Sequence, residues 1–506
     1  MVFPVPVLLL YCALITMSGL VLARAEPVAD RLPLELPLRT FVHRLLDQNK
    51  AIRSKGYERD IAATGTERAN AAFQPTLNAQ ATTGELRQQN TAEEDLFRSN
   101  LGIYERRGQD YSVGVSKTFT TGTRVEGKVT LSRFMTNLIQ QQRPDQGENY
   151  RTFYGVTLMQ PLARDAGLRV NTAKIQVAEM DRDAANYAVN DTRTRVIAEA
   201  VSTYYDLALA ERRFESAEAR VAMAERINTL VGKLYGEGRL PESEVWEVES
   251  SRARFESGRS EARQQAREQL NRLRNLLLAV SDEVPDTLKT RETLPEVIPA
   301  SPDFGRSVQT ALENRDDFRM RKIMVEREDV QIAYTRNQGW PRVDLVASYG
   351  LNGLDLSTGR AFDVTRNQDY ATWNVGLQFS MPLFENKQAK ADTEVANLRK
   401  EDAILSLKAL EVAIVNDIDT SLGLLASAAE RWALWQDVAT REAHQIALER
   451  QRFLSGRSDT REIILREERG INAHLAVVEQ QVAWIKANTL LQAAQGTLLG
   501  QYQGGE

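Results

Sequence analysis

The feature that most constrains the fold of this chain is a set of landmarks that occurs twice. Pro161 and Pro382 each close an alternating apolar segment, and a long stretch without proline follows each of them. A Gly-Arg pair interrupts both stretches at nearly the same distance, beginning at Gly238 in the first and at Gly456 in the second. Landmarks that recur in the same order indicate that one structural unit is repeated in the chain.

Further landmarks set the limits of the two units. An asparagine precedes the first strand of each unit at almost the same spacing, Asn49 in the first and Asn314 in the second. The segment 282–301 is rich in proline, which prevents a continuous helix, and it is predicted to be a linker. We predict that repeat 1 spans 38–281 and repeat 2 spans 302–500, with a short tail, 501–506.

Each repeat has the same predicted plan: a helix, a strand, a polar loop, a second strand, and two long helices folded about the Gly-Arg turn. Repeat 1 has the first helix 38–72, the strands 76–86 and 150–162, and the long helices 167–235 and 241–280. Repeat 2 has the first helix 306–337, the strands 342–351 and 371–383, and the long helices 387–454 and 459–499. Only repeat 1 has an extra hairpin, 111–134, with glycine at its turn. This hairpin either widens a membrane barrel or lies outside the membrane.

The predicted strands alternate between apolar and polar residues. In 372–380 the apolar side chains share one face: Trp373, Val375, Leu377 and Phe379. A period of two produces one apolar and one polar face, which suits either a half-buried sheet in a soluble domain or a membrane barrel around a polar lumen. About ten residues cross a bilayer when the strand is tilted. Two other features favour the barrel: an export signal predicted at the N-terminus, described below, and the long helices beside these strands.

The long helices repeat their apolar residues with a period near 3.5, which is typical of a coiled-coil seam. In 167–235 one seam position holds Ala200, Leu207, Phe214 and Val221, and the other holds Val196, Thr203, Ala210, Ala217, Ala224 and Val231. In 387–454 the seam follows Ile414, Ile418, Leu422, Leu425 and Ala429. These helices alone suit a soluble coiled coil, so a periplasmic coiled-coil adaptor or scaffold is the alternative function.

The number of strands predicts an oligomer. Four strands, or six with the hairpin, cannot close a barrel wide enough for a solute, and open sheet edges cannot lie in lipid. Three copies would supply about twelve strands, or about eighteen with the hairpin. We therefore expect a mainly α protein with membrane β structure, in which the β-barrel closes by trimerisation and the helices form a hollow cylinder.

The N-terminal apolar run predicts export from the cytoplasm. Residues 1–25 are identified as a signal peptide that ends in an A-x-A site formed by Ala23 and Ala25, and 26–37 follow as an extended segment. A retained membrane anchor is one alternative, and a lipoprotein cleaved before Cys12 is another. Cys12 is the one cysteine of the chain, so cleavage after Ala25 leaves neither a disulfide nor a thiolate metal site.

Composition and motifs exclude several function classes. The formal net charge is −5 with 26% charged residues, which argues against nucleic-acid binding. A mean hydropathy of −0.40 argues against a bundle of spanning helices. The three histidines have no metal-ligand spacing, and neither a nucleophile elbow nor a phosphate loop is present. We expect no enzyme activity, no metal and no cofactor.

The duplicated plan resembles the TolC-like outer-membrane efflux protein family over nearly all of the chain after the signal peptide. Four patterns carry the resemblance: the strand ends around Pro161 and Pro382, the strand opening 340–345, and the helix turns 234–240 and 453–458. The resemblance implies a homotrimer in the outer-membrane lipid, a twelve-stranded barrel, and an α-helical barrel across the periplasm. It also implies docking on a periplasmic adaptor protein and an inner-membrane pump for efflux or type I secretion. The extra hairpin departs from this plan.

The same resemblance implies positions for the functional residues. The adaptor would dock at the two helix turns, which comprise Gly238, Arg239, Leu240, Gly456, Arg457 and Ser458. Carboxylates beyond the second turn would form a periplasmic gate, with Asp459 and Glu462 as candidates, Glu244 as the equivalent in repeat 1, and Arg461 as an ion-pair partner. The alternative for each acid is a helix-dipole role, because a carboxylate in the first turn of a helix is common.

Overall fold

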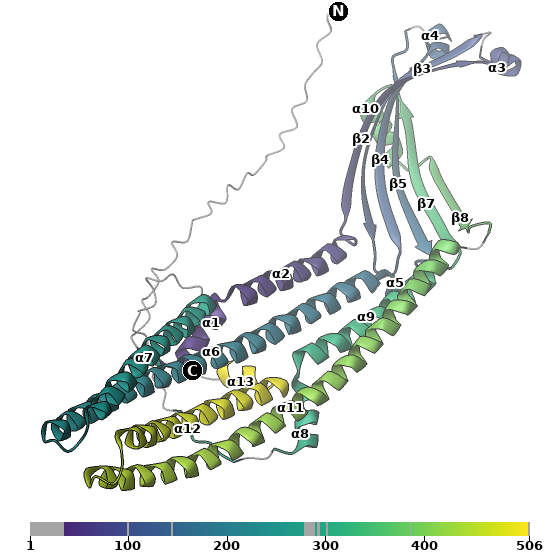
Figure 1. The fold of residues 1–506 in the computed structure, drawn as a ribbon. Coiled ribbons are helices and arrows are strands. Elements are labelled where there is room, and N and C mark those ends of the chain that lie inside the picture. Colours follow the sequence, from purple (N-terminus) through teal and green to yellow (C-terminus); the bar gives the residue numbers. More distant parts are fainter. Residues whose placement is uncertain are drawn as a thin grey trace, which may run out of the picture.

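The protein is elongated, with a β-sheet at one end and long helices running away from it (Figure 1). The computed structural model describes residues 35–98, 101–142, 145–277, 289–290, 294–299, 302–384 and 386–503. The predicted signal peptide, 1–25, and most of the predicted linker, 282–301, lie outside the described residues.

Six strands form one antiparallel sheet in the order β2-β3-β4-β5-β7-β8. Their bounds are β2 Thr76–Gln89, β3 Ile103–Thr118, β4 Arg124–Thr136, β5 Asn149–Pro161, β7 Arg342–Asp355 and β8 Ala371–Ser380. The hairpin of the first half, β3 and β4, lies inside this sheet between β2 and β5 and is longer than 111–134 at its outer end. Strands β2 and β8 are the two edges, and within the described part of the chain neither has a partner on its outer side.

The first helix of each half is broken, so the predictions of single helices at 38–72 and 306–337 are wrong. The first half has α1 Leu38–Gln48 and α2 Lys50–Ala71, and the second half has α8 Phe304–Asn314 and α9 Asp316–Gln338. Asn49 is extended and caps α2, because its side chain accepts hydrogen bonds from the backbone N–H groups of Ala51 and Ile52. Arg315 is extended in the same way at the second break.

The long helices fold back on themselves in both halves. In the first half α5 Leu168–Asn171 leads into α6 Ala173–Gly236, which packs on α7 Glu242–Leu277. In the second half α11 Lys387–Leu454 packs on α12 Thr460–Ala494. The predicted helix 459–499 stops early because Gly496 adopts φ +72°, and α13 Leu498–Gln503 continues into the predicted tail.

The main core lies where α1 meets the middle of the long helices. Phe41 of α1, Tyr204 of α6 and Ile418 of α11 are buried in one cluster, and the rings of Phe41 and Tyr204 stack with centroids 6.1 Å apart. Each such side chain contributes about 1.5–3 kcal/mol through burial. A second cluster near the helix turns contains Met223, Ile227, Val231, Val248, Phe453, Ile463 and Ile464. The four long helices are therefore held together at two levels.

Three short helices and a small strand pair complete the described fold. Helices α3 Ala92–Phe97 and α4 Asn137–Gln142 lie at the outer end of the hairpin, whereas α10 Thr358–Arg366 lies between β7 and β8 in sequence (Figure 1). The strands β1 Glu35–Leu36 and β6 Lys289–Thr290 pair in parallel.

Candidate functional site

One face of the six-stranded sheet is apolar across its whole width. Register places one residue of each strand in a row, and this row is Leu77, Val115, Gly127, Val156, Tyr349 and Trp373. The next row on the same face is Ala79, Val113, Val129, Tyr154, Leu351 and Ala371. Trp373 and Leu77 are each 71% exposed in the single chain. An exposed apolar band of this kind is suited to contact with lipid.

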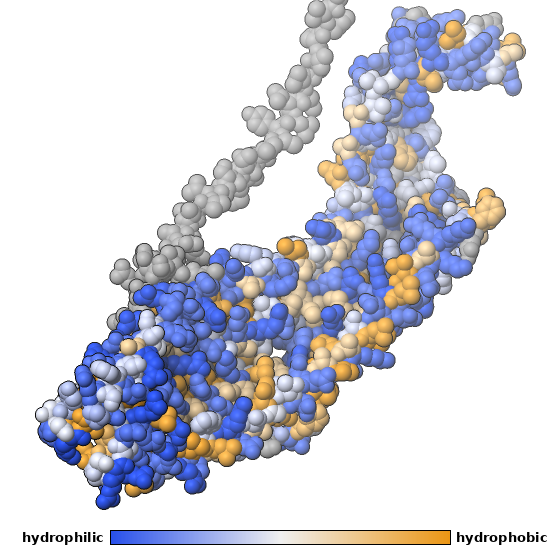
Figure 2. All heavy atoms as spheres, viewed as in Figure 1, coloured by the Kyte–Doolittle hydropathy of each residue, from blue (hydrophilic) through white to orange (hydrophobic). Residues whose placement is uncertain are grey.

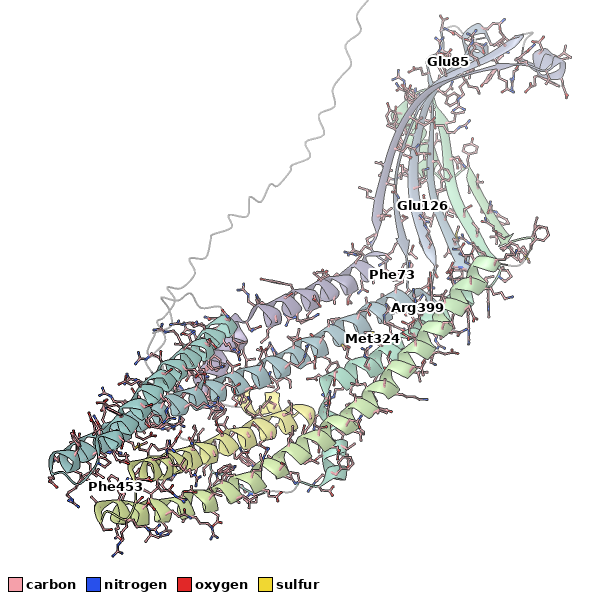
Figure 3. All side chains as sticks on the ribbon, in the orientation of Figure 1. Phe73, Glu85, Glu126, Met324, Arg399 and Phe453 are labelled. Atoms are coloured by element: carbon pink, nitrogen blue, oxygen red, sulfur yellow. The ribbon has the colours of Figure 1, made fainter. Side chains whose placement is uncertain are left out.

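The opposite face is polar. The row between the two apolar ones is Asn78, Gly114, Lys128, Gly155, Gly350 and Thr372. The neighbouring row is Thr76, Ser116, Glu126, Thr157, Ser348 and Asn374, and Glu126 is labelled in Figure 3. Hydroxyl, amide and charged groups suit the wall of a water-filled lumen, so the two faces have the chemistry of a membrane barrel wall.

Helix α10 covers the outer end of the apolar face. The Thr152 hydroxyl donates to the carbonyl oxygen of Ala361 at 2.8 Å, and the ring of Phe362 stacks on Tyr154 at 6.1 Å. A Cβ added at Gly353 would lie 2.3 Å from the Ala361 carbonyl oxygen, so only glycine permits this approach. The loop of the second half therefore packs on the sheet without adding a strand to it.

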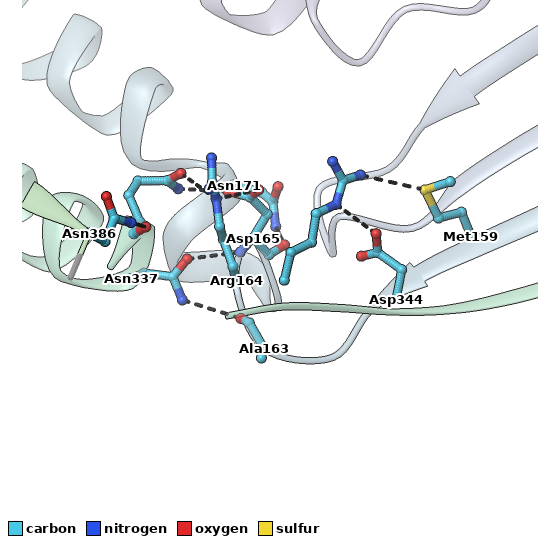
Figure 4. A network of polar contacts seen from close by, with 10 residues as sticks. Met159, Ala163, Arg164, Asp165, Asn171, Asn337, Asp344 and Asn386 are labelled. Atoms are coloured by element: carbon cyan, nitrogen blue, oxygen red, sulfur yellow. Dashed lines mark hydrogen bonds and ion pairs between the residues drawn. The ribbon is translucent and has the colours of Figure 1, made fainter. Parts of the chain in front are cut away.

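A polar network joins the two halves where the sheet meets the helices (Figure 4). After Pro161 ends β5, the backbone N–H of Asp165 donates to the Asn337 side chain at 2.8 Å, and the Gln338 amide donates to the Asp165 carboxylate at 2.6 Å. Asp344 is 1% exposed and accepts from Arg342 at 2.6 Å. Pro161 is buried in this network, whereas Pro382 is exposed beyond the end of β8. The two predicted strand-to-helix junctions thus differ in their surroundings.

The two predicted helix turns have the same geometry and lie at the end of the molecule far from the sheet (Figure 1). Gly238 and Gly456 both adopt φ +70°, a left-handed conformation that favours glycine. The backbone N–H of Arg239 donates to the Leu234 carbonyl oxygen at 2.9 Å, and that of Arg457 donates to the Arg452 carbonyl oxygen at 2.8 Å. Both turns are therefore Schellman-type helix ends. The other turn residues are Leu240, which is half-buried, and Ser458.

The gate candidates lie together at this end, and each contacts a residue of its own chain. The Asp459 carboxylate caps α12 by accepting from the backbone N–H of Glu462 at 2.8 Å, which is the helix-terminal role expected as the alternative. Glu462 pairs with Arg466 at 2.7 Å. The Glu244 carboxylate accepts from the backbone N–H of Thr460 at 3.0 Å and so ties the start of α7 to the start of α12.

Arg461 is the most exposed of the candidates. Its side chain is 79% exposed and lies 3.7 Å from the Glu247 carboxylate, an arrangement that leaves it largely in solvent. An exposed pair at this distance contributes at most a few tenths of a kcal/mol to stability. Among the four candidates, Glu244 has the contact that joins the two halves most directly.

An ion pair near the second turn was missed by sequence reasoning. The Arg450 guanidinium donates to the Glu467 carboxylate at 2.5 Å, and this hydrogen bond raises the pKa of Arg450 above its ordinary value. Glu467 is 9% exposed overall and lies beside the second core cluster. In sequence alone, the adjacent acids Glu467 and Glu468 are typical of a solvated helix face. Only the contact between α11 and α12 identifies Glu467 as a structural group.

A cluster of charges surrounds the second helix break. The Arg315 guanidinium binds Asp317 at 2.8 Å and Asp417 at 2.9 Å. Burial lowers the pKa of Arg315, but its hydrogen bonds to Asp317 and Asp417 outweigh this and raise the pKa above its ordinary value. Burial raises the pKa values of Asp191 and Asp316. These ion pairs fix the extended backbone of Arg315 between α8 and α9.

Two searches of the described residues bear on other functions. They contain no group of three or more histidine, cysteine or acidic side chains that could hold a metal ion. Among the described helices, α11 alone is long and apolar enough to be a candidate membrane-spanning helix. Only 28% of its most apolar 18-residue segment is buried. Figure 2 shows apolar side chains along this helix, and the exposed ones include Leu398, Leu405, Val412, Leu424 and Leu434. At 68 residues, or about 100 Å, α11 is much longer than a bilayer is thick.

Comparison with known proteins agrees with this geometry. Residues 307–503 match the model of the family described as outer membrane efflux protein. The chain has no sequence match among proteins with curated descriptions. Its fold is similar to a membrane protein from Pseudomonas aeruginosa, with 18% identity, TM-score 0.64, and coverage of 93% of this chain and 98% of that one.

Two outer-membrane proteins have the same fold. The CmeC outer membrane channel of Campylobacter jejuni is 15% identical, with TM-score 0.63 and coverage of 91% of this chain and 86% of that one. The outer membrane protein VceC from Vibrio cholerae is 16% identical, with TM-score 0.63 and coverage of 91% and 96%. Residues 307–503 are thus similar to the outer membrane efflux protein family, and the chain as a whole has the fold of the TolC-like outer-membrane channels.

Proposed function

We propose that this protein is the outer-membrane exit channel of an efflux or type I secretion system. The observation that carries the proposal is the sheet with one apolar and one polar face, joined to long helices, in a chain with the family match at 307–503. Lipid would contact the apolar band, and solutes or polypeptides would pass along the polar one. The scaffold alternative is not favoured, because a scaffold does not need such a sheet and the relatives in the family are channels rather than enzymes or scaffolds.

We propose that three copies form the channel. A sheet with two unpaired edges cannot remain in hydrocarbon, so the β8 edge of one copy would pair with the β2 edge of the next. The exposed apolar residues of α11, such as Leu405 and Val412, would be covered by helices of the neighbouring copy. In this arrangement the two halves act as tandem copies of one unit, each supplying part of the wall.

We propose that the helix turns form the periplasmic end, where an adaptor docks and the duct narrows. Three copies would bring Asp459, Glu462 and Glu244 around one axis, and rings of carboxylates favour cations. The closed state would be held by pairs such as Glu462 with Arg466 and Arg461 with Glu247. An inner-membrane pump would then deliver the solute through the adaptor.

Oligomeric state tests the channel against the scaffold. The purified protein should require detergent and run as a heat-resistant trimer. A monomer that stays soluble without detergent would replace the channel with the scaffold.

The gate is tested by conductance. Replacing Asp459 with Asn and Glu462 with Gln should raise single-channel conductance and reduce cation preference, because the acidic ring and its ion pair are both removed. The matched control is Glu249→Gln, an exposed acid of the first half in α7. Conductance and selectivity equal to those of the control would remove these two acids from the gate.

A further inference from the structure

The hairpin β3-β4 departs from a plan of two strands for each half of the chain. It occupies the interior of the sheet, since β3 pairs with β2 along fourteen residues and β4 pairs with β5 along eleven. Its apolar residues, such as Val113 and Val129, share the apolar face of the other strands, and Glu126 and Lys128 share the polar face. The half of the hairpin nearest the helices therefore has the two-faced chemistry of a barrel wall, whereas in its outer half the same face carries charged residues such as Glu105 and Arg107.

The turn of the hairpin is fixed to the junction between sheet and helices. Gly122 adopts φ +89°, and a Cβ there would lie 2.5 Å from the Asp165 carbonyl oxygen. The backbone N–H of Gly167 donates to the Thr121 carbonyl oxygen at 3.2 Å, and Thr123 hydrogen-bonds to Gln160. A loop folded away from the barrel would not have its turn built into the base of β5.

The helices that support the sheet give an independent measure of how wide the sheet of one copy must be. Four helices reach the sheet side by side, in the order α2, α6, α9 and α11, and they connect to β2, β5, β7 and β8 (Figure 1). Three helix spacings of about 9 Å cover about 27 Å. Five strand spacings cover about 31 Å at a tilt near 40°, whereas the three spacings left without the hairpin cover about 19 Å. The six-stranded sheet thus matches the width of the helices that support it.

From these observations we infer that the assembled barrel has eighteen strands, with β8 of each copy paired to β2 of the next. This inference rests on the proposed trimer and adds the strand count and the width of the mouth. The backbone diameter is about 36 Å, against about 24 Å for twelve strands, and the cross-section is about twice as large. Such a mouth accommodates bulkier solutes or extended polypeptides.

Disulfide trapping in the full-length trimer tests the position of the hairpin. In a Cys12→Ser background, the pair Gln80→Cys with Ser112→Cys reports β2 beside β3, and Glu126→Cys with Thr157→Cys reports β4 beside β5. Opposed residues have Cβ atoms about 5 Å apart, within reach of a disulfide after small adjustments. The control pair, Thr76→Cys with Thr157→Cys, joins two residues of the same row, which lie about 14 Å apart if the hairpin is inserted.

Oxidation of both sheet pairs but not of the control, in a trimer, is the expected result. A disulfide in the control without one between positions 126 and 157 would place the hairpin outside the barrel and overturn the inference. If both of these disulfides formed but the detergent-solubilised protein were a monomer, the hairpin would lie in the sheet without a trimer. That result would overturn closure of the barrel by three copies, and the proposed channel with it.

Deletion of residues 103–148 provides a second measurement. It joins β2 to β5 with their antiparallel directions kept, so a narrower barrel of twelve strands should form. The largest polyethylene glycol that enters the pore from the outer side should then be smaller than for the full chain. An unchanged polymer cut-off in assembled trimers would show that the hairpin does not widen the mouth.

Discussion

The two halves of the chain use the loop between their outer strands in different ways. In the first half this loop forms β3 and β4 and joins the sheet, whereas in the second half it forms α10 and lies on the sheet's apolar face. The hairpin alternates with a period of two, as in Tyr111, Val113 and Val115, so every second side chain points to the same face. In α10, Ala361 and Thr365 are four residues apart and both are buried. The period of the apolar residues thus decides whether an insertion widens the sheet or covers it.

The largest effect is expected at the hairpin turn of the first half. Gly122→Val combines a left-handed backbone with contacts to the Asp165 carbonyl oxygen and the Pro161 ring at 2.5 and 2.9 Å. We expect a loss of about 4 kcal/mol from strain and overpacking, and a lower thermal midpoint of the trimer by intrinsic fluorescence. Gly127→Val in β4 is the control, because a Cβ there meets nothing within 4 Å. A midpoint equal to that of the control would show that the turn is not built into the junction.

The second effect concerns α10 in the second half. Gly353→Val would place side-chain atoms against the backbone of Ala361 and should displace α10, at a cost of about 3 kcal/mol. Limited proteolysis should then cleave between 358 and 366. The control is Gly376→Val in β8, which has open space around it. Protection from protease in both variants would mean that α10 is not held by this contact.

A smaller difference in stability is expected between equivalent substitutions near the two helix turns. Alignment of Gly238 with Gly456 places Gly232 opposite Arg450 and Glu249 opposite Glu467, so only the second half has an ion pair at these two positions. Glu467→Gln should destabilise the protein by about 1 kcal/mol, since the Arg450 side chain is 58% exposed and screened by solvent. Glu249→Gln should leave the thermal midpoint unchanged. Equal midpoints for the two variants would remove the difference between the turns.

The smallest effect depends on pH and lies at the helix break of the second half. Burial raises the pKa of Asp316 above 3.8, so the folded protein binds this proton more tightly than the unfolded chain. The stability that Asp316 contributes is therefore fully present below pH 3.8 and is lost as pH rises through the raised pKa. Asp316→Asn should raise the thermal midpoint by about 1 °C at pH 7 and leave it unchanged below about pH 4. An equal shift at both pH values would contradict this assignment, and the exposed Asp60→Asn in α2 is the control.

Much of this fold is predictable because the signals are local. The alternation in 371–380 corresponds to β8, and α11 begins and ends at the predicted residues, 387 and 454. The insertion of the hairpin between β2 and β5 depends on the pairing of β3 with β2 and of β4 with β5 across the loops that contain α3 and α4, which the alternation within each strand does not specify. The break at Arg315 was missed for a similar reason, because its backbone is fixed by ion pairs to Asp317 and to Asp417 of a helix a hundred residues away.

The candidate gate was predictable only in position. Turn chemistry at Gly238 and Gly456 identifies the end of the helices from sequence. The contacts of Glu244 with Thr460 and of Arg450 with Glu467 require the packing of separate helices. The role of Asp459 as a helix cap is visible in sequence as a general tendency, and its role in a gate remains a proposal.

Single-channel recording tests the central claim most directly. The purified protein would be added to a planar lipid bilayer under voltage, and the current would be recorded in a salt gradient. We expect discrete, long-lived conductance steps with a preference for cations. A protein that remains soluble without detergent, does not insert and produces no current would contradict the channel.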